Sequence, residues 1–167
     1  MKRILLFFSI ILLLNNCTRD KIGENSQLYG SWKLTEWITS NPIDLNNNGI
    51  STTNFSPGCL LGSELIINDD FNGTLFYSST MSFFTRMENN QLVYITSCIT
   101  DSENEPLPIT YTFENDTILL NNDGETSIFA LDGDQLKLVI FDGFVAADVD
   151  TLDLTETHNL TFVFTRV

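Results

Sequence analysis

The sequence predicts an all-β protein, an antiparallel up-and-down meander that closes into a small barrel of eight or nine strands. Short apolar and β-branched runs recur between separators rich in Asn, Asp and Gly. No window beyond the N-terminal apolar run sustains the period of about 3.6 residues that a helix requires. Of the 167 residues, 43% are apolar and only 18% are charged, which excludes a disordered chain and suits one domain.

The expected strands are joined by short turn-forming sequences, which place each strand antiparallel to the next. These separators are DDFNG at 69–73, ENN at 88–90, NNDG at 121–124 and DGD at 132–134. A meander of this kind closes as a barrel or a sandwich, and its unbroken order favours the barrel. We expect strands at residues 29–39, 60–68, 74–85, 91–99, 108–114, 117–121, 126–131, 135–141 and 159–166.

Clean alternation in two of these strands predicts one face in a core and one in water. The inward residues would be Ile109, Tyr111 and Phe113 in one strand, and Leu160, Phe162 and Phe164 in the other.

The N-terminus carries the pattern of an export signal. Lys2 and Arg3 precede an apolar run, residues 4–14, that is interrupted only by Ser9. A helix over this run would rise about 16 Å, well short of the roughly 30 Å hydrocarbon core of a bilayer. A removed signal peptide at residues 1–16 is therefore favoured over a membrane anchor helix.

This signal resembles that of bacterial lipoproteins, in which a cysteine follows the apolar run at once and is acylated. Cys17 holds that position and Leu14 matches the family pattern, whereas Asn15 and Asn16 depart from it. The resemblance implies that acylated Cys17 anchors the protein to a membrane of the bacterial cell envelope. The outer membrane is the expected location. The sequence does not decide between its periplasmic face and its surface face. Residues 17–26 would form the lipidated tether and residues 27–167 the domain.

The charge balance argues against a nucleic-acid partner. The chain has 22 acidic side chains and 8 basic ones, a net charge of -14. Cleavage before Cys17 would remove Lys2 and Arg3 and leave about -16. Too few cations remain to neutralise a row of phosphates.

Cys59 and Cys98 are expected to form a disulfide in an oxidising compartment, with two buried free thiols as the alternative. The bridge would contribute about 4 kcal/mol. The expected strands place a third strand between the two cysteines, and next-but-one strands lie about 9.6 Å apart, beyond the roughly 7 Å limit for a disulfide. One cysteine must therefore leave the sheet, and Cys59 qualifies because it follows the irregular stretch 41–58.

The two ends of the meander carry a second resemblance. A G-x-W sequence, Gly30 to Trp32, lies in the first strand, and Arg166 lies in the last. Together with the meander, this is similar to the lipocalin-like domain of bacterial lipoproteins, over about residues 27–167. The resemblance implies a binding fold without catalytic residues. It also implies that Trp32 plugs the closed end of the barrel while Arg166 packs across the indole.

One loop resembles the opening of a calcium site. Asp44, Asn46 and Asn48 alternate before Gly49, as in D-x-N-x-N-G, but Phe55 stands where a bidentate Glu would complete the pattern. An Asx-rich turn that caps its own backbone is the favoured alternative to this weak calcium site.

The remaining polar groups do not predict an enzyme. His158, the only histidine, is expected to be an exposed strand-end residue, and no G-x-S-x-G sequence is present. A pair of catalytic carboxylates of the glycosidase type stays an open alternative, because the distance between two side chains in the fold cannot be derived from the sequence. The remaining acidic stretch is expected to be a solvated loop, and it comprises Asp148, Asp150, Asp153 and Glu156.

Two functions follow from these expectations. The first is a lipid-anchored binding module for a small apolar or amphipathic ligand. The alternative is a structural or protein-interaction envelope lipoprotein with a filled barrel. An interior cavity of a few hundred cubic ångström, lined by Phe, Tyr and Leu, would separate the two.

Overall fold

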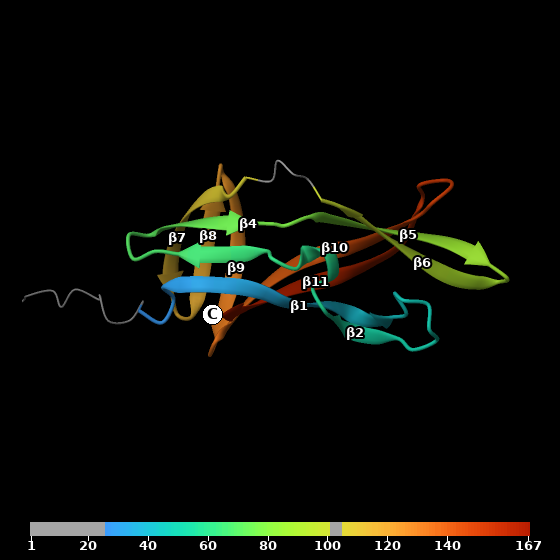
Figure 1. Ribbon diagram of the computed structural model, residues 1–167, viewed down its shortest axis with the longest axis horizontal. Helices are drawn as coiled ribbons and strands as arrows, with labels where there is room; N and C mark the ends of the chain where they lie inside the picture. The colour runs from blue at the N-terminus through green and yellow to red at the C-terminus, as the bar shows by residue number, and fades with distance from the viewer. Residues whose placement is uncertain (1–25, 101–104) are drawn as a thin grey trace, which may run out of the picture.

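The computed structural model describes residues 26–100 and 105–167 (Figure 1). This part of the chain forms strands and one short 3₁₀ helix, η1 at Gly58–Leu60. The strands are β1 (Gly30–Ile43), β2 (Thr52–Phe55), β3 (Glu64–Ile67), β4 (Asn72–Phe76), β5 (Thr80–Glu88), β6 (Gln91–Ile99), β7 (Leu107–Glu114), β8 (Thr117–Asn122), β9 (Glu125–Asp132), β10 (Gln135–Asp148) and β11 (Leu154–Arg166).

Eight of these strands close into an antiparallel barrel, which confirms the predicted fold class. Their order around the barrel is β1, β3, β4, β7, β8, β9, β10 and β11, and β11 pairs back with β1. Closure leaves the barrel strands without the unpaired edges that an open sheet presents.

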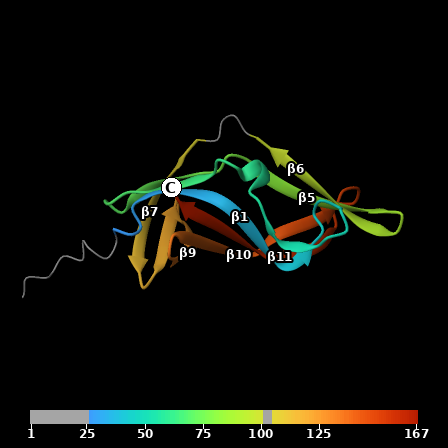
Figure 2. The same cartoon turned by 60° about the horizontal axis from the view of Figure 1, so that its bottom comes forward.

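A second part of the molecule, here called the distal lobe, extends from one end of the barrel (Figures 1 and 2). Strands β1 and β10, with 14 residues each, and β11, with 13, continue beyond the barrel. Their far ends join three further strands in a curled sheet with the order β2, β1, β11, β10, β5 and β6. The distal lobe comprises this sheet together with η1 and the loop at 44–51.

The prediction of one continuous strand at 74–85 is wrong, and so is the prediction of an unbroken meander. The chain leaves the barrel after β4 and enters the distal lobe as β5, so β4 pairs with β7. The β5–β6 hairpin joins the sheet through a short parallel pairing of β5 with β10, from Phe83 opposite Ala146 to Thr85 opposite Asp148.

A bulge in β10 turns that strand from the barrel into the distal lobe. The pairing with β11 shifts between Ile140 and Phe144, and Asp142 has a φ of 53°. A Cβ at Gly143 would lie 2.7 Å from the Cβ of Ile140, so only glycine fits there. Bulges of this kind redirect strands and the side chains that they carry.

Each part of the molecule has its own core, and that of the barrel is filled by side chains. The barrel core includes Trp32, Leu65, Ile118, Phe129 and Phe164, each fully buried. The distal core comprises Trp37, Ile43, Phe83, Phe144, Ala146 and Leu160. Large buried side chains therefore occupy the interior of the eight-stranded barrel.

Candidate functional site: a pocket in the distal lobe

A pocket of about 450 Å³ opens between the loop that precedes η1 and the β5–β6 hairpin. Ligand sites commonly measure about 300–1,000 Å³, so the volume suits a small molecule. Its apolar wall consists of Trp37, Leu45, Ile50, Phe55 and Met81. The rings of Trp37 and Phe55 stack with centroids 4.2 Å apart, and this stack joins the pocket to the distal core.

The polar wall of the pocket is made of amides and hydroxyls. It consists of Asn46, Thr52, Asn54, Ser56 and Thr96. Gly58 and the disulfide cysteines complete the lining, and none of these described lining residues carries a group that titrates. Such a wall can donate and accept hydrogen bonds but cannot balance a charge.

The loop is fastened to the edge of β6 by one side-chain amide. Asn47 Nδ2 donates to the carbonyl oxygen of Tyr94 at 2.8 Å, and the N–H of Tyr94 donates to Asn47 Oδ1 at 2.8 Å. The side chain thereby makes the two bonds that a neighbouring strand would make. These bonds join the loop at 44–51 to the edge of β6 at one end of the pocket, next to the lining residue Asn46.

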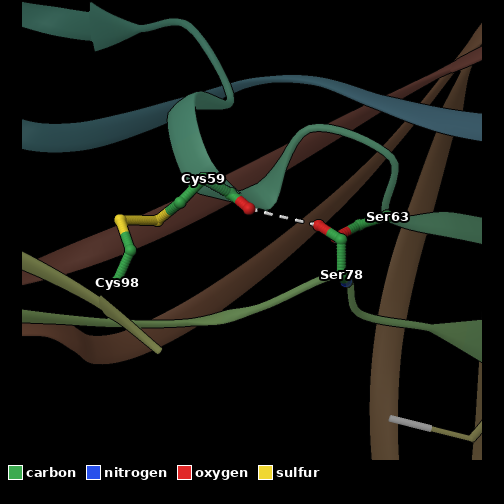
Figure 3. The surroundings of a disulfide bond; sticks show 4 residues. All are labelled: Cys59, Ser63, Ser78 and Cys98. Carbon is green, nitrogen blue, oxygen red and sulfur yellow. Dashed lines mark hydrogen bonds between the residues drawn. A yellow bond between two sulfur atoms is a disulfide. The ribbon is translucent and has the colours of Figure 1, made fainter. Parts of the chain in front are cut away.

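The Cys59–Cys98 disulfide closes the other end, and Figure 3 shows its surroundings. The Cα atoms lie 6.0 Å apart, within the range that a disulfide allows. Cys59 lies in η1 and off the sheet, as expected, while Cys98 lies near the end of β6. Ser78 supports η1 by donating a hydrogen bond to the Cys59 carbonyl at 3.2 Å.

The loop suggested as a calcium site bonds to its own backbone. Asp44 accepts the N–H groups of Asn48 and Gly49 at 3.0 and 2.7 Å, and Asn48 Oδ1 accepts the N–H of Ile50 at 2.8 Å. Asn46 Oδ1 also accepts from Asn48, at 3.3 Å. These hydrogen bonds are those of the Asx-turn alternative. In that arrangement the side-chain oxygens that calcium would need already accept hydrogen bonds from backbone N–H groups.

We therefore expect isothermal titration with calcium in the millimolar range to give no binding heat, because the loop offers one carboxylate and lacks the bidentate Glu. Titration with magnesium serves as the control for nonspecific heat. A saturable calcium heat that Asp44→Asn removes would instead establish the metal site.

His158 is not the exposed residue that the sequence predicted. It is 9% exposed and its ring stacks on Phe144, with centroids 5.7 Å apart. Asn41 Nδ2 donates to Nδ1 at 3.0 Å, which leaves the proton on Nε2 to be donated to Glu156 Oε1 at 2.5 Å. The strand prediction failed here because β11 begins at Leu154, so His158 faces the distal core.

The acidic stretch is likewise only partly a solvated loop. Asp148 ends β10 and its carboxylate accepts the N–H groups of Asp150 and Thr151, which lowers the pKa of Asp148. Glu156 lies in β11 and accepts a hydrogen bond from the Tyr94 hydroxyl. Burial and this bond to Glu156 raise the pKa of Tyr94, so Tyr94 stays protonated and ties β6 to β11.

Where β1 pairs with the end of β11, Arg166 lies over Trp32, with its guanidinium carbon 5.5 Å from the ring centroid. The indole N–H donates to the Leu28 carbonyl at 2.8 Å. Arg166 also donates to the carbonyls of Gln27 and Tyr29, at 3.0 and 2.5 Å. Both side chains thus hold the segment that leads into β1 and are occupied by structural contacts.

The predicted signal peptide, Cys17 and most of the tether lie outside the described residues. In residues 26–100 and 105–167, no helix has the length and apolar character needed to cross a membrane. The same residues contain no cluster of three His, Cys, Asp or Glu side chains placed to hold a metal ion.

The fold and the site together define a class: an all-β barrel protein with a neutral pocket outside the barrel. The chain matches no protein-family model, no curated protein and no solved structure.

The pocket itself was not predicted from the sequence. Trp37 could have been identified as a candidate, because it is a second large aromatic residue in the first expected strand. Phe55, Met81 and Thr96 gave no signal, because they converge only through pairings between distant segments.

Proposed function

We propose that this protein is a lipid-anchored binding module of the cell envelope, with its ligand site in the pocket of the distal lobe. One observation carries the proposal: a pocket of about 450 Å³ has an apolar wall and a polar wall. It lies between the Asn47–Tyr94 hydrogen bonds and the Cys59–Cys98 disulfide. Pre-formed pockets with mostly apolar walls and a few polar groups are the usual form of small-molecule sites. The N-terminal signal and Cys17 support the anchor.

The experiment is native mass spectrometry of the exported protein. We expect a co-purifying small molecule, and we expect Thr96→Phe to abolish it because that side chain would occupy the pocket. Thr110→Phe is the matched control, since Thr110 is exposed on β7 of the barrel. Retention of the adduct by Thr96→Phe, or its absence from the wild-type protein after supply of small amphiphiles, would contradict the proposal.

A structural or protein-interaction role is the second candidate, and the filled barrel favours it. Exposed apolar side chains also lie on the outer face of neighbouring barrel strands, with Leu119 paired opposite Ile128 and with Val139 and Phe141 on β10. If the wild-type protein binds no small molecule, cross-linking in envelope preparations through a photoreactive residue at 128 would test this role.

A further inference from the structure

The pocket wall has hydrogen-bonding capacity but no charge. Its polar side chains are the amides and hydroxyls described above, and Cys59 and Cys98 are joined and do not titrate. A charged ligand group at this partly exposed wall would give up part of its water and find no opposite charge among the described lining residues. Such desolvation is far more costly for an ion than for a hydroxyl or amide.

The basic side chains of the described residues are all placed elsewhere. They are Lys33 on the exposed face of β1, Arg86 paired with Glu88, Lys137 paired with Asp132, and Arg166 over Trp32. The charged residue next to the pocket in sequence is Asp44, whose carboxylate accepts two backbone N–H groups. An anionic ligand would therefore find no cation among the described lining residues and would approach a strongly acidic protein.

The edge of β6 adds neutral hydrogen-bonding groups to the same space. The N–H and C=O of Tyr94 point away from β5 and toward the loop, where Asn47 binds them. Alternate residues of an antiparallel strand direct their backbone groups to the same edge. The N–H and C=O of Thr96 therefore face the space between the Asn47–Tyr94 hydrogen bonds and the Cys59–Cys98 disulfide. The pocket lies in this space.

We propose that the pocket selects an electrically neutral amphiphile. Its apolar body would lie against Leu45, Phe55 and Met81, and its hydroxyl or amide head would bind the Asn and Thr side chains of the polar wall. The inference rests on the proposed function, because it specifies the ligand of that pocket. Alcohols, acylglycerols and neutral amides with short chains belong to this class, whereas fatty acids and phosphate-bearing lipids do not.

The test compares three probes with the same chain, octanol, octanoate and octylammonium, titrated calorimetrically into the purified protein below their aggregation limits. We expect octanol to bind. We expect the affinity of octanoate to be lower by about tenfold or by a larger factor. Octanoate or octylammonium binding as tightly as octanol would overturn the neutral-ligand inference and leave the pocket intact. Failure of all three probes would count against the proposed function itself.

A variant with a cation in the pocket reverses the expected order. Thr96→Lys should raise octanoate affinity to that of octanol or above, because the ammonium would balance the carboxylate. Thr110→Lys, on the exposed face of β7, carries the same charge far from the pocket and should leave octanoate weak. If Thr96→Lys still binds octanol but gains nothing for octanoate, the neutral wall does not set the selectivity and the inference is wrong.

Discussion

Replacing Trp32 by alanine is expected to lower the free energy of unfolding by about 3–5 kcal/mol. The indole is fully buried in the barrel core, it donates to the Leu28 carbonyl, and it carries Arg166 over its face. Truncation would leave a cavity and an unpaired carbonyl and would remove the surface on which Arg166 packs. The midpoint of urea unfolding, followed by circular dichroism, measures the loss.

Trp32→Phe is the matched control, because it keeps most of the packing and loses the N–H donor; we expect it to cost about 1–2 kcal/mol. The alanine variant has a further use. Trp37 would be its only tryptophan, since the chain contains two. Its fluorescence should follow the same shifted transition, because β1, β10 and β11 run through both parts. A Trp37 transition left at the wild-type midpoint would show that the distal lobe unfolds independently.

Removing the disulfide with the double variant Cys59→Ser and Cys98→Ser is expected to cost about 4 kcal/mol. The bridge spans a sequence separation of 39 and ties η1 to β6. Within the described sheet β6 pairs only with β5, so without the bridge the loop side would be held to β6 mainly by Asn47. We also expect binding at the pocket to weaken, because both cysteines line it.

Two measurements check this result. The urea midpoint should fall, and alkylation of the wild-type protein under denaturing, non-reducing conditions should leave the masses of Cys59 and Cys98 unchanged. Ser78→Ala is the control, since it removes the bond to the Cys59 carbonyl but keeps the bridge, and should cost about 1 kcal/mol. An unchanged midpoint in the double variant would mean that Asn47 alone is sufficient to hold the lobe closed.

Local patterns in the sequence predicted the barrel well, because each barrel hairpin is specified by its own turn and alternation. The short turns at 69–73, 121–124 and 132–134 each join neighbouring barrel strands in the structure. The position of Cys59 off the sheet could also be derived, because strand spacing forbids a bridge across an intervening strand.

The distal lobe could not be predicted in the same way, because a bulge in β1 changes which side chains face inward and a bulge in β10 hides the continuation of that strand. In β1 the pairing shifts between Leu34 and Glu36, so Trp32 and Trp37 are both buried although their numbers differ in parity. In β10 the sequence around Asp142 and Gly143 predicted a strand end, yet the strand bends there and continues. A shift of one residue inverts every face that follows it. The burial of Trp37, which lines the pocket, depends on the shift in β1.

The contacts of Arg166 also fix where the described chain enters the barrel. Arg166 binds residues of the segment 26–29 at one end of the barrel, and the distal lobe projects from the opposite end of the molecule (Figure 1). A lipid attached upstream of Ser26 would hold the barrel nearest the membrane, and the pocket would then open at the far side. In that arrangement the barrel would separate the distal lobe from the membrane.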